Sequence, residues 1–141
     1  MLEEGKKAPK VKGVDFSKAT TILYFYPKDD TPGCTAEACS FRDNYESLTK
    51  KGYQVIGVSP DAEEKHDKFK TKYELPFHLV ADTDKKIANA YGVWGLKKMY
   101  GKEYEGIFRT TFIIDTTGKI IKVIKKVDTK NATQQVLDEL A

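Results

Sequence analysis

The sequence predicts an α/β domain in which a mixed β-sheet is flanked by helices on both faces. Short runs of β-branched and aromatic residues, typical of buried strands, alternate through most of the chain with longer segments of helical apolar spacing. A strand–turn–strand pattern follows near the end. The length of 141 residues corresponds to a single domain, residues 1–141, which can bury a core without disulfides or metals.

The first half of the chain shows the strand–helix alternation most clearly. Glycine and proline break a polar lead-in, and runs rich in Val, Ile, Tyr and Phe then indicate strands. Apolar residues spaced three or four positions apart, with a glycine as stop signal, indicate helices between them. The predicted elements are an irregular or weak hairpin lead-in over 1–19, a strand over 20–26, a helix over 35–51, a strand over 54–59 and a polar helix over 60–73.

The second half predicts a short strand over 77–80, then a helix capped by Asp82 or Thr83 and ended by Gly92. Residues 92–108 contain four glycines and carry Trp94, Tyr100 and Tyr104, and we interpret them as a long loop whose aromatic side chains cover the core. Strands over 109–115 and 119–125 flank a Thr-Thr-Gly turn, and a helix over 131–140 closes the chain. Strands separated by helices pair in parallel and the hairpin adds an antiparallel edge, which is the thioredoxin-type arrangement.

The composition excludes several function classes. There are 24 Lys and Arg against 21 Asp and Glu, a net charge of +3 that is spread along the chain and gives no basic patch for nucleic acid or membrane. We see no signal peptide and no apolar run near the ~20 residues of a membrane span, so we expect a cytoplasmic protein. Two cysteines are too few for a disulfide framework, and we expect them to be reduced at rest or reactive.

Cys34 occupies the most informative position in the sequence. It follows the first predicted strand and the turn Thr31-Pro32-Gly33, so it is expected in the first turn of the next helix. Helix N-termini carry unpaired N–H groups and a partial positive charge, which stabilise a thiolate. Because the thiolate is the nucleophilic form of cysteine, this position predicts cysteine redox chemistry.

Two further residues could assist Cys34. Arg109 opens an otherwise apolar and hydroxylated strand, and a buried arginine must find a partner, so it is the best candidate for a cation beside the sulfur. Thr31, three residues before Cys34, could place a hydroxyl next to the thiol. Structural roles remain open for both residues, because Arg109 could form an ordinary salt bridge and Thr31 could belong only to the turn.

Cys39 is the second cysteine, five residues after Cys34 on the same predicted helix. This spacing places the two Cα atoms roughly 8–9 Å apart on opposed helix faces, whereas a disulfide requires Cα atoms within about 7 Å. The two cysteines therefore cannot form a disulfide, nor share a metal ion, unless part of the segment 34–40 unwinds.

Other polar residues have simpler interpretations. Glu37 and Arg42 are read as first-turn and solvent-face charges, and His66 lies on a polar helix and is expected at the surface. His78 is expected to pack beside its apolar neighbours rather than to bind a ligand. Two alternative functions remain open, a thiol–disulfide oxidoreductase and a redox sensor or holdase that exposes the segment 34–43 when oxidised. The Cys-x₄-Cys spacing argues against the oxidoreductase, since such enzymes use Cys-x-x-Cys.

The residues around Cys34 resemble those of the peroxiredoxins, whose signature Pro-x-x-x-Thr-x-x-Cys is matched by Pro27, Thr31 and Cys34. The longer run over 24–43, together with 55–59, 72–77 and 91–95, is similar to the bacterioferritin comigratory protein, or Q-type, subfamily. In one respect the sequence departs from this family. Its lead-in before the first core strand is shorter than the usual one, which contains a β-hairpin.

This resemblance implies a mechanism and a role for each matching residue. Cys34 resembles the peroxidatic cysteine and Cys39 the resolving cysteine, Thr31 and Arg109 resemble the residues that bind the peroxide oxygens, and Pro27 resembles the proline that shields the sulfur from water. The family reduces hydrogen peroxide and organic hydroperoxides through a cysteine sulfenic acid and then a disulfide. The resemblance further implies a monomer that needs no cofactor or metal and is re-reduced by a thioredoxin-like or glutaredoxin-like protein.

Overall fold

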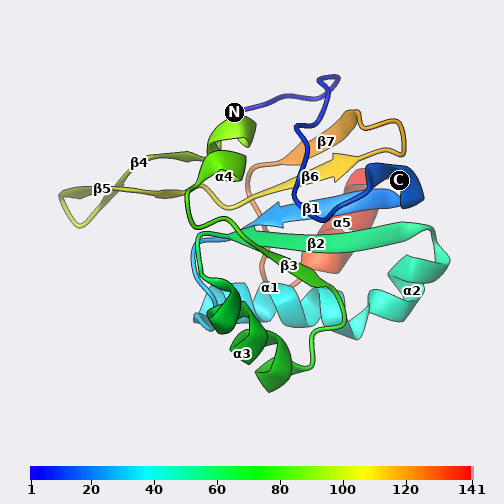
Figure 1. Ribbon diagram of the computed structural model, residues 1–141, viewed down its shortest axis with the longest axis horizontal. Coiled ribbons are helices and arrows are strands. Elements are labelled where there is room, and N and C mark those ends of the chain that lie inside the picture. Colours follow the sequence, from blue (N-terminus) through cyan, green and yellow to red (C-terminus); the bar gives the residue numbers. More distant parts are fainter. Residues whose placement is uncertain (141) are drawn as a thin grey trace.

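A five-stranded mixed β-sheet forms the centre of the molecule, as the computed structural model of residues 1–140 shows (Figure 1). The strand order is β3-β2-β1-β6-β7, in which β1, β2 and β3 are parallel and β6 and β7 are antiparallel to their neighbours. The strands are β1 (Thr20–Phe25), β2 (Tyr53–Ser59), β3 (His78–Ala81), β6 (Thr110–Ile114) and β7 (Ile120–Ile124). The predicted α/β class, with parallel strands and an antiparallel hairpin, is confirmed.

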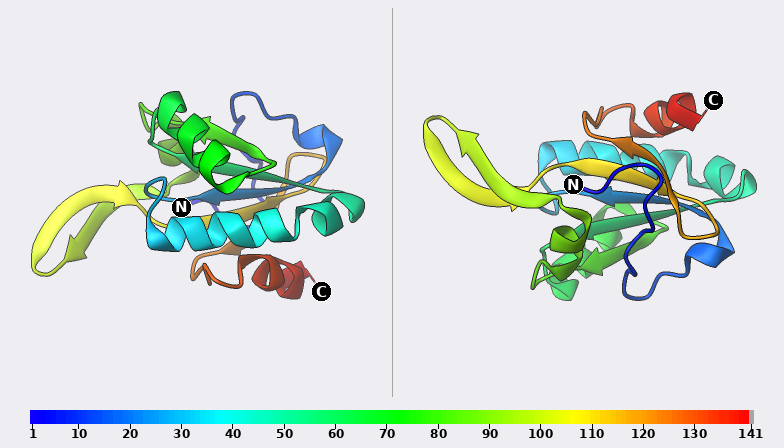
Figure 2. Two further views of the ribbon diagram at one scale, coloured as in Figure 1. Left: turned by 90° about the horizontal axis from the view of Figure 1, so that it is seen from below. Right: turned by 90° about the horizontal axis from the view of Figure 1, so that it is seen from above.

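Helices cover both faces of this sheet (Figure 2). One face carries α1, α2, α3 and α5, and the other carries α4 and the N-terminal segment. The helices are η1 (Phe16–Lys18), α1 (Pro32–Asp43), α2 (Tyr45–Lys50), α3 (Glu63–Tyr73), α4 (Lys86–Tyr91) and α5 (Ala132–Leu140). Within residues 1–140, no helix is both long and apolar enough to cross a membrane.

Strand β1 divides the core into two layers because it is buried on both faces. Ile22 and Tyr24 point to the layer under α1 and α5, whereas Leu23 and Phe25 point to the layer under α4. The carboxyl end of β1 leads directly into the loop before α1. The start of α1 is thus fixed to a buried strand at the centre of the sheet.

The prediction of one helix over 35–51 was wrong, because this segment forms two helices, α1 and α2, with different boundaries. Helix α1 begins at Pro32, where a proline is tolerated because the first helical N–H has no partner inside the helix. The segment breaks at Asn44 (φ −112°, ψ 9°), whose side-chain amide donates a hydrogen bond to the carbonyl of Ser40. Tyr45 and Leu48 still pack on the core after the break, so the apolar spacing alone did not reveal it.

The loop predicted over 92–108 is a separate two-stranded hairpin, β4 (Trp94–Met99) and β5 (Lys102–Ile107). Tyr100 and Gly101 at its tip both have positive φ, 53° and 76°, the geometry of a two-residue hairpin turn. The hairpin pairs with no strand of the main sheet and projects from the end of the molecule where α1 begins (Figures 1 and 2). Tyr100 and Tyr104 are exposed and do not cover the core as expected, whereas Trp94 packs against it.

Candidate active site around Cys34

Cys34 lies in the first turn of α1, as the sequence predicted. Thr31 precedes the helix in an extended conformation, Pro32 is its first residue, and Cys34 is its third. The thiol is almost completely buried, with 1% of the residue exposed. The unpaired N–H groups of this helix end and its partial positive charge therefore act on the sulfur in a poorly solvated environment, where water screens them little.

Arg109 approaches Cys34 from the neighbouring strand. In the antiparallel pair of β1 and β6, Phe25 is opposite Thr110, so the residue before Thr110 lies at the carboxyl end of β1. The guanidinium Nη2 of Arg109 donates a hydrogen bond to Sγ of Cys34 at 3.2 Å. The structure thus brings together two residues that are 75 positions apart in the sequence, and Arg109 is the cation that was predicted beside the Cys34 sulfur.

Gly33 makes room for this contact, and the sequence analysis treated it only as part of a turn. A Cβ atom at Gly33 would lie 3.3 Å from Nη2 of Arg109, a distance that would force the guanidinium to move by a few tenths of an ångström. The absence of a side chain at this position therefore sets how closely Arg109 approaches the first turn of α1.

Glu37 is the site residue that sequence reasoning missed. It was interpreted as a first-turn charge, but it is completely buried, and its Oε1 accepts a hydrogen bond from Nη1 of Arg109 at 2.8 Å. Burial raises the pKa of Glu37 to about 7, and the charge and hydrogen bond of Arg109 only partly oppose this rise. A usable signal was present, because residues three apart on a helix share a face and Glu37 is three residues after Cys34.

Thr31 and Pro27 lie in the loop between β1 and α1 and are partly buried. The Thr31 hydroxyl donates to the carbonyl of Lys28 at 2.9 Å rather than to Cys34. Because this bond uses the hydroxyl hydrogen, the oxygen of Thr31 is left as a hydrogen-bond acceptor. Pro27 directly follows the buried Tyr26 at the end of β1.

Cys39 is further along α1, half-buried, with a free thiol. Both cysteines lie within the continuous helix Pro32–Asp43, so the geometric argument from the sequence holds and the two sulfurs cannot bond in this conformation. The residue after Cys39 is anchored to α5, because the side chain and carbonyl of Ser40 form three hydrogen bonds with Thr133 at 3.0–3.1 Å. Residues 34–39 thus lie between two polar anchors, Arg109 at one end and Thr133 at the other.

A strand-to-helix turn that carries a buried thiol against an arginine is the arrangement that the resemblance led us to expect. The AhpC/TSA family profile matches residues 3–123 of the chain. The chain belongs to this family. Two bacterial relatives named Peroxiredoxin Bcp match over nearly their whole length. The Bacillus subtilis protein is 49% identical, and the match covers 99% of this chain and 95% of the relative. The Escherichia coli protein is 42% identical, and the match covers 99% of this chain and 96% of the relative.

Solved structures agree with this assignment. The Xanthomonas campestris bacterioferritin comigratory protein, whose structures were described for its alkyl peroxide reduction activity, has 36% identity and a TM-score of 0.83 over 89% of this chain and 79% of its own. Peroxidoxin BcpB from Mycobacterium tuberculosis has 28% identity and a TM-score of 0.84 over 99% and 97%. The predicted Q-type peroxiredoxin family and the predicted thioredoxin-like fold are both confirmed.

A buried hydrogen-bond network holds the loop of this peroxiredoxin that bears Thr31. His66, which was expected at the surface, is only 2% exposed, and its Nδ1 contacts a carboxylate oxygen of Asp29. The other oxygen of Asp29 accepts a hydrogen bond from the Tyr26 hydroxyl, and its backbone N–H donates to Asp61 at 2.7 Å. The loop before α1 is therefore fixed to α3 and to the end of β2.

The charge of this network follows from its partners. Nε2 of His66 lies 3.0 Å from the carbonyl of Val80, which can only accept, so this nitrogen carries a proton. Burial acts to lower the pKa of His66, but the hydrogen bond and the charge of Asp29 outweigh it and the pKa is raised. Asp29, Asp61 and His66 are also close enough to share a metal ion, but their ligand atoms already bond to one another or to neighbouring groups, so we assign no metal to them.

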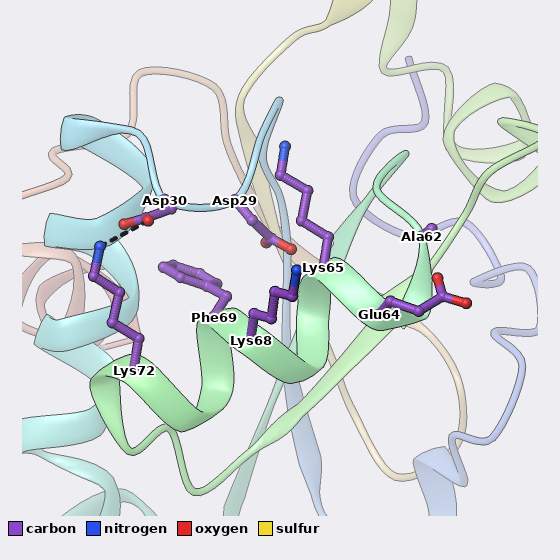
Figure 3. Close-up of a pocket in the computed structure, with 8 residues that line it drawn as sticks. All are labelled: Asp29, Asp30, Ala62, Glu64, Lys65, Lys68, Phe69 and Lys72. Atoms are coloured by element: carbon purple, nitrogen blue, oxygen red, sulfur yellow. Dashed lines mark hydrogen bonds and ion pairs between the residues drawn. The ribbon is translucent and has the colours of Figure 1, made fainter.

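A groove runs along α3 beside the same loop (Figure 3). Phe69 lies between the loop and the helix, and an ion pair at 2.8 Å joins Lys72 to Asp30 across the groove. The lining residues are Asp29, Asp30, Ala62, Glu64, Lys65, Lys68, Phe69 and Lys72. Because neither cysteine nor Arg109 lines it, this groove is not the approach to the sulfur of the peroxiredoxin site.

Proposed function

We propose that this chain reduces hydrogen peroxide and organic hydroperoxides, with Cys34 as the peroxidatic cysteine and Cys39 as the resolving cysteine. The observation that carries the proposal is the hydrogen bond from Arg109 to the buried sulfur of Cys34 in the first turn of α1. A thiol in this position is next to a cation that can hold it as a thiolate, and it lies on a scaffold shared with peroxiredoxins.

The first step is the attack of the Cys34 thiolate on the terminal oxygen of the peroxide. The S–O bond forms as the O–O bond breaks, the sulfur is oxidised to a sulfenic acid, and the departing alkoxide or hydroxide takes up a proton. Negative charge moves from the sulfur to the leaving oxygen in this step. A guanidinium and helix N–H groups that are already directed at the site stabilise this charge without rearrangement.

The second step is the attack of the Cys39 thiol on the sulfenic sulfur, which forms the Cys34–Cys39 disulfide and releases water. This step requires residues 34–39 to leave the helical conformation, because the helix separates the two sulfurs. The bonds between Ser40 and Thr133 keep the rest of α1 on α5 while this segment unwinds. A thioredoxin-like or glutaredoxin-like dithiol protein then returns both cysteines to thiols by exchange.

We further infer that the chain works as a monomer in the cytoplasm. Both cysteines lie on one helix, so resolution needs no cysteine from a second copy. The cycle also consumes thiol reductant, which the cytoplasm maintains. Light scattering at the concentration used for activity would test the oligomeric state, and a dimer that exchanges Cys39 between copies would contradict it.

The test is a single oxidation of the fully reduced protein with one equivalent of hydrogen peroxide, followed by intact mass and free-thiol counting. We expect rapid loss of both thiols and of about two mass units in the unmodified chain, as one disulfide forms. Cys34→Ser should not react rapidly, and Cys39→Ser should stop at a sulfenic acid. Slow loss of thiols, or equal loss in Cys34→Ser, would overturn the assignment and favour a redox sensor without turnover.

A further inference from the structure

Arg109 is shared by two buried acidic groups, a feature that the proposed cycle does not use. Its Nη2 donates to Sγ of Cys34 at 3.2 Å and its Nη1 donates to Oε1 of Glu37 at 2.8 Å. Both partners are buried, with 1% of Cys34 and none of Glu37 exposed. Among residues 1–140, no second cation bonds to either group, so a single positive charge faces two groups that can each become an anion.

The surroundings of Glu37 disfavour two anions at once. Its second carboxylate oxygen, Oε2, is buried and has no hydrogen-bond partner within the described residues. Tyr24 faces the pair from β1 as a neutral phenol, because burial first, and then the negative charges of Glu37, Cys34 and Asp29, raise its pKa well above the ordinary value. A thiolate together with a carboxylate would leave one buried negative charge without compensation, which is strongly unfavourable.

We infer that Cys34 and Glu37 carry the negative charge in alternation: Glu37 takes up a proton when Cys34 becomes a thiolate and releases it when Cys34 is oxidised. This inference rests on the proposed role of Cys34 and deepens it by identifying where the proton of the reaction is held. Glu37 acts through Arg109 and does not touch the peroxide, so it is a positioning and proton-holding residue.

Protons and charges balance when Cys34 and Glu37 exchange a proton, both in the reduced site and during peroxide attack. In the reduced site, a thiol with an ionised Glu37 is in equilibrium with a thiolate and a protonated Glu37, so thiolate formation releases no proton to solution. During peroxide attack, the thiolate, the peroxide and protonated Glu37 give the sulfenic acid, the alcohol or water, and ionised Glu37. The sulfenic acid is neutral, and Arg109 then pairs with Glu37 alone. The raised pKa of Glu37, about 7, means that both of its forms are accessible near neutral pH.

The Glu37→Gln variant separates this inference from a purely structural role. If Glu37 only orients Arg109, its replacement weakens the contact of Arg109 with the sulfur and the fraction of thiolate falls. If Glu37 competes for the charge of Arg109, its replacement by a neutral side chain of the same shape raises the ratio of thiolate to thiol roughly tenfold. The thiolate fraction is measured in a Cys39→Ser background by ultraviolet absorbance and by the rate of alkylation with iodoacetamide. Glu64→Gln, an exposed position on α3, is the matched control.

A second measurement follows the proton itself and is independent of the thiolate signal. Stopped-flow mixing of the Cys39→Ser protein with hydrogen peroxide and a pH indicator counts protons taken up from solution. With Glu37 present we expect close to none for each Cys34 oxidised, and with Glu37→Gln we expect one, because hydroxide then takes its proton from the solvent. Uptake of one proton in both proteins, or a lower thiolate fraction in Glu37→Gln, would overturn the inference.

The outcomes also distinguish this inference from the proposed function. Alkylation and thiolate absorbance do not depend on peroxide, so they report the coupling of Cys34 and Glu37 even if Cys34 fails to react with peroxide. Rapid peroxide attack with no effect of Glu37→Gln on the thiolate fraction would instead leave the peroxidase function intact and remove Glu37 from the proton balance.

Discussion

Removal of Arg109 tests the electrostatic basis of the site most directly. A hydrogen bond between charged groups contributes about 1.5–3 kcal/mol to the state that forms it. The bond from Arg109 to Cys34 is 3.2 Å long, and 23% of the Arg109 side chain is exposed, so solvent screens part of the interaction. We therefore take about 2 kcal/mol, near the low end of the range. At about 1.4 kcal/mol for each factor of ten, Arg109→Ala should lower the thiolate equilibrium of Cys34 by about 30-fold.

The assay is the rate of Cys34 alkylation by iodoacetamide at pH 7, in a Cys39→Ser background, because this rate follows the thiolate concentration. The single-turnover rate of hydrogen peroxide attack should fall by at least the same factor, since Arg109 also faces the developing charge on the leaving oxygen. Arg42→Ala is the control, because Arg42 lies on the same helix but contacts Asp43 and the carbonyl of Tyr73. A change smaller than about threefold in both rates would refute this account of the site.

Three further predictions follow from contacts around the site. Gly33→Ala should slow single-turnover peroxide attack roughly threefold to tenfold with little change in melting temperature, because the added Cβ displaces the Arg109 guanidinium. An unchanged rate would show that the close approach of Arg109 to Gly33 is not needed. His66→Gln should destabilise the fold by about 3 kcal/mol in urea unfolding, because it leaves Asp29 buried without its partner. The pKa of His66 is raised in the folded protein, so the stability that its protonation provides is full below about pH 6.5 and is lost as the pH rises through the pKa of the folded state. The unmodified chain should therefore lose stability above about pH 6.5 more steeply than His66→Gln. Thr133→Val removes hydrogen bonds that hold α1 on α5, so disulfide formation after peroxide attack should become faster; a slower step would mean that these bonds guide the unwinding instead.

Sequence reasoning placed Cys34 correctly in the first turn of α1 because local signals all agreed. A buried strand, a turn with proline and glycine, and a helix start are each encoded within a few residues, and together they fix Cys34 at the helix N-terminus. Arg109 was found by a different argument, the cost of leaving an arginine unpaired at the start of an apolar strand. Its contact with Cys34 depends on the pairing of β6 with β1, which single-sequence patterns do not determine.

The residues that were missed are polar groups on buried helix faces. His66 is three residues before Phe69, so helical spacing placed it on the apolar side of α3, but the many charged neighbours made the whole helix look solvated. Burial of Glu37 and His66 depends on partners that other elements supply, Arg109 and Asp29. The hairpin of β4 and β5 was missed for a local reason, because Tyr100 has positive φ and a Tyr-Gly turn lacks the usual Asn-Gly or Asp-Gly signal.

The contacts of α1 support the proposed unwinding of its first half, because its second half is held by separate contacts. Phe41 is completely buried, and Ser40 bonds to Thr133, so the second half of the helix is fixed to the core and to α5. The first turn is held by Arg109, and in the proposed cycle this bond weakens when the sulfur becomes a neutral sulfenic acid. Cys39 lies at the boundary between these halves, immediately before Ser40. In the proposed cycle, unwinding of residues 34–39 ends at Ser40, so the second half of α1 keeps its packing.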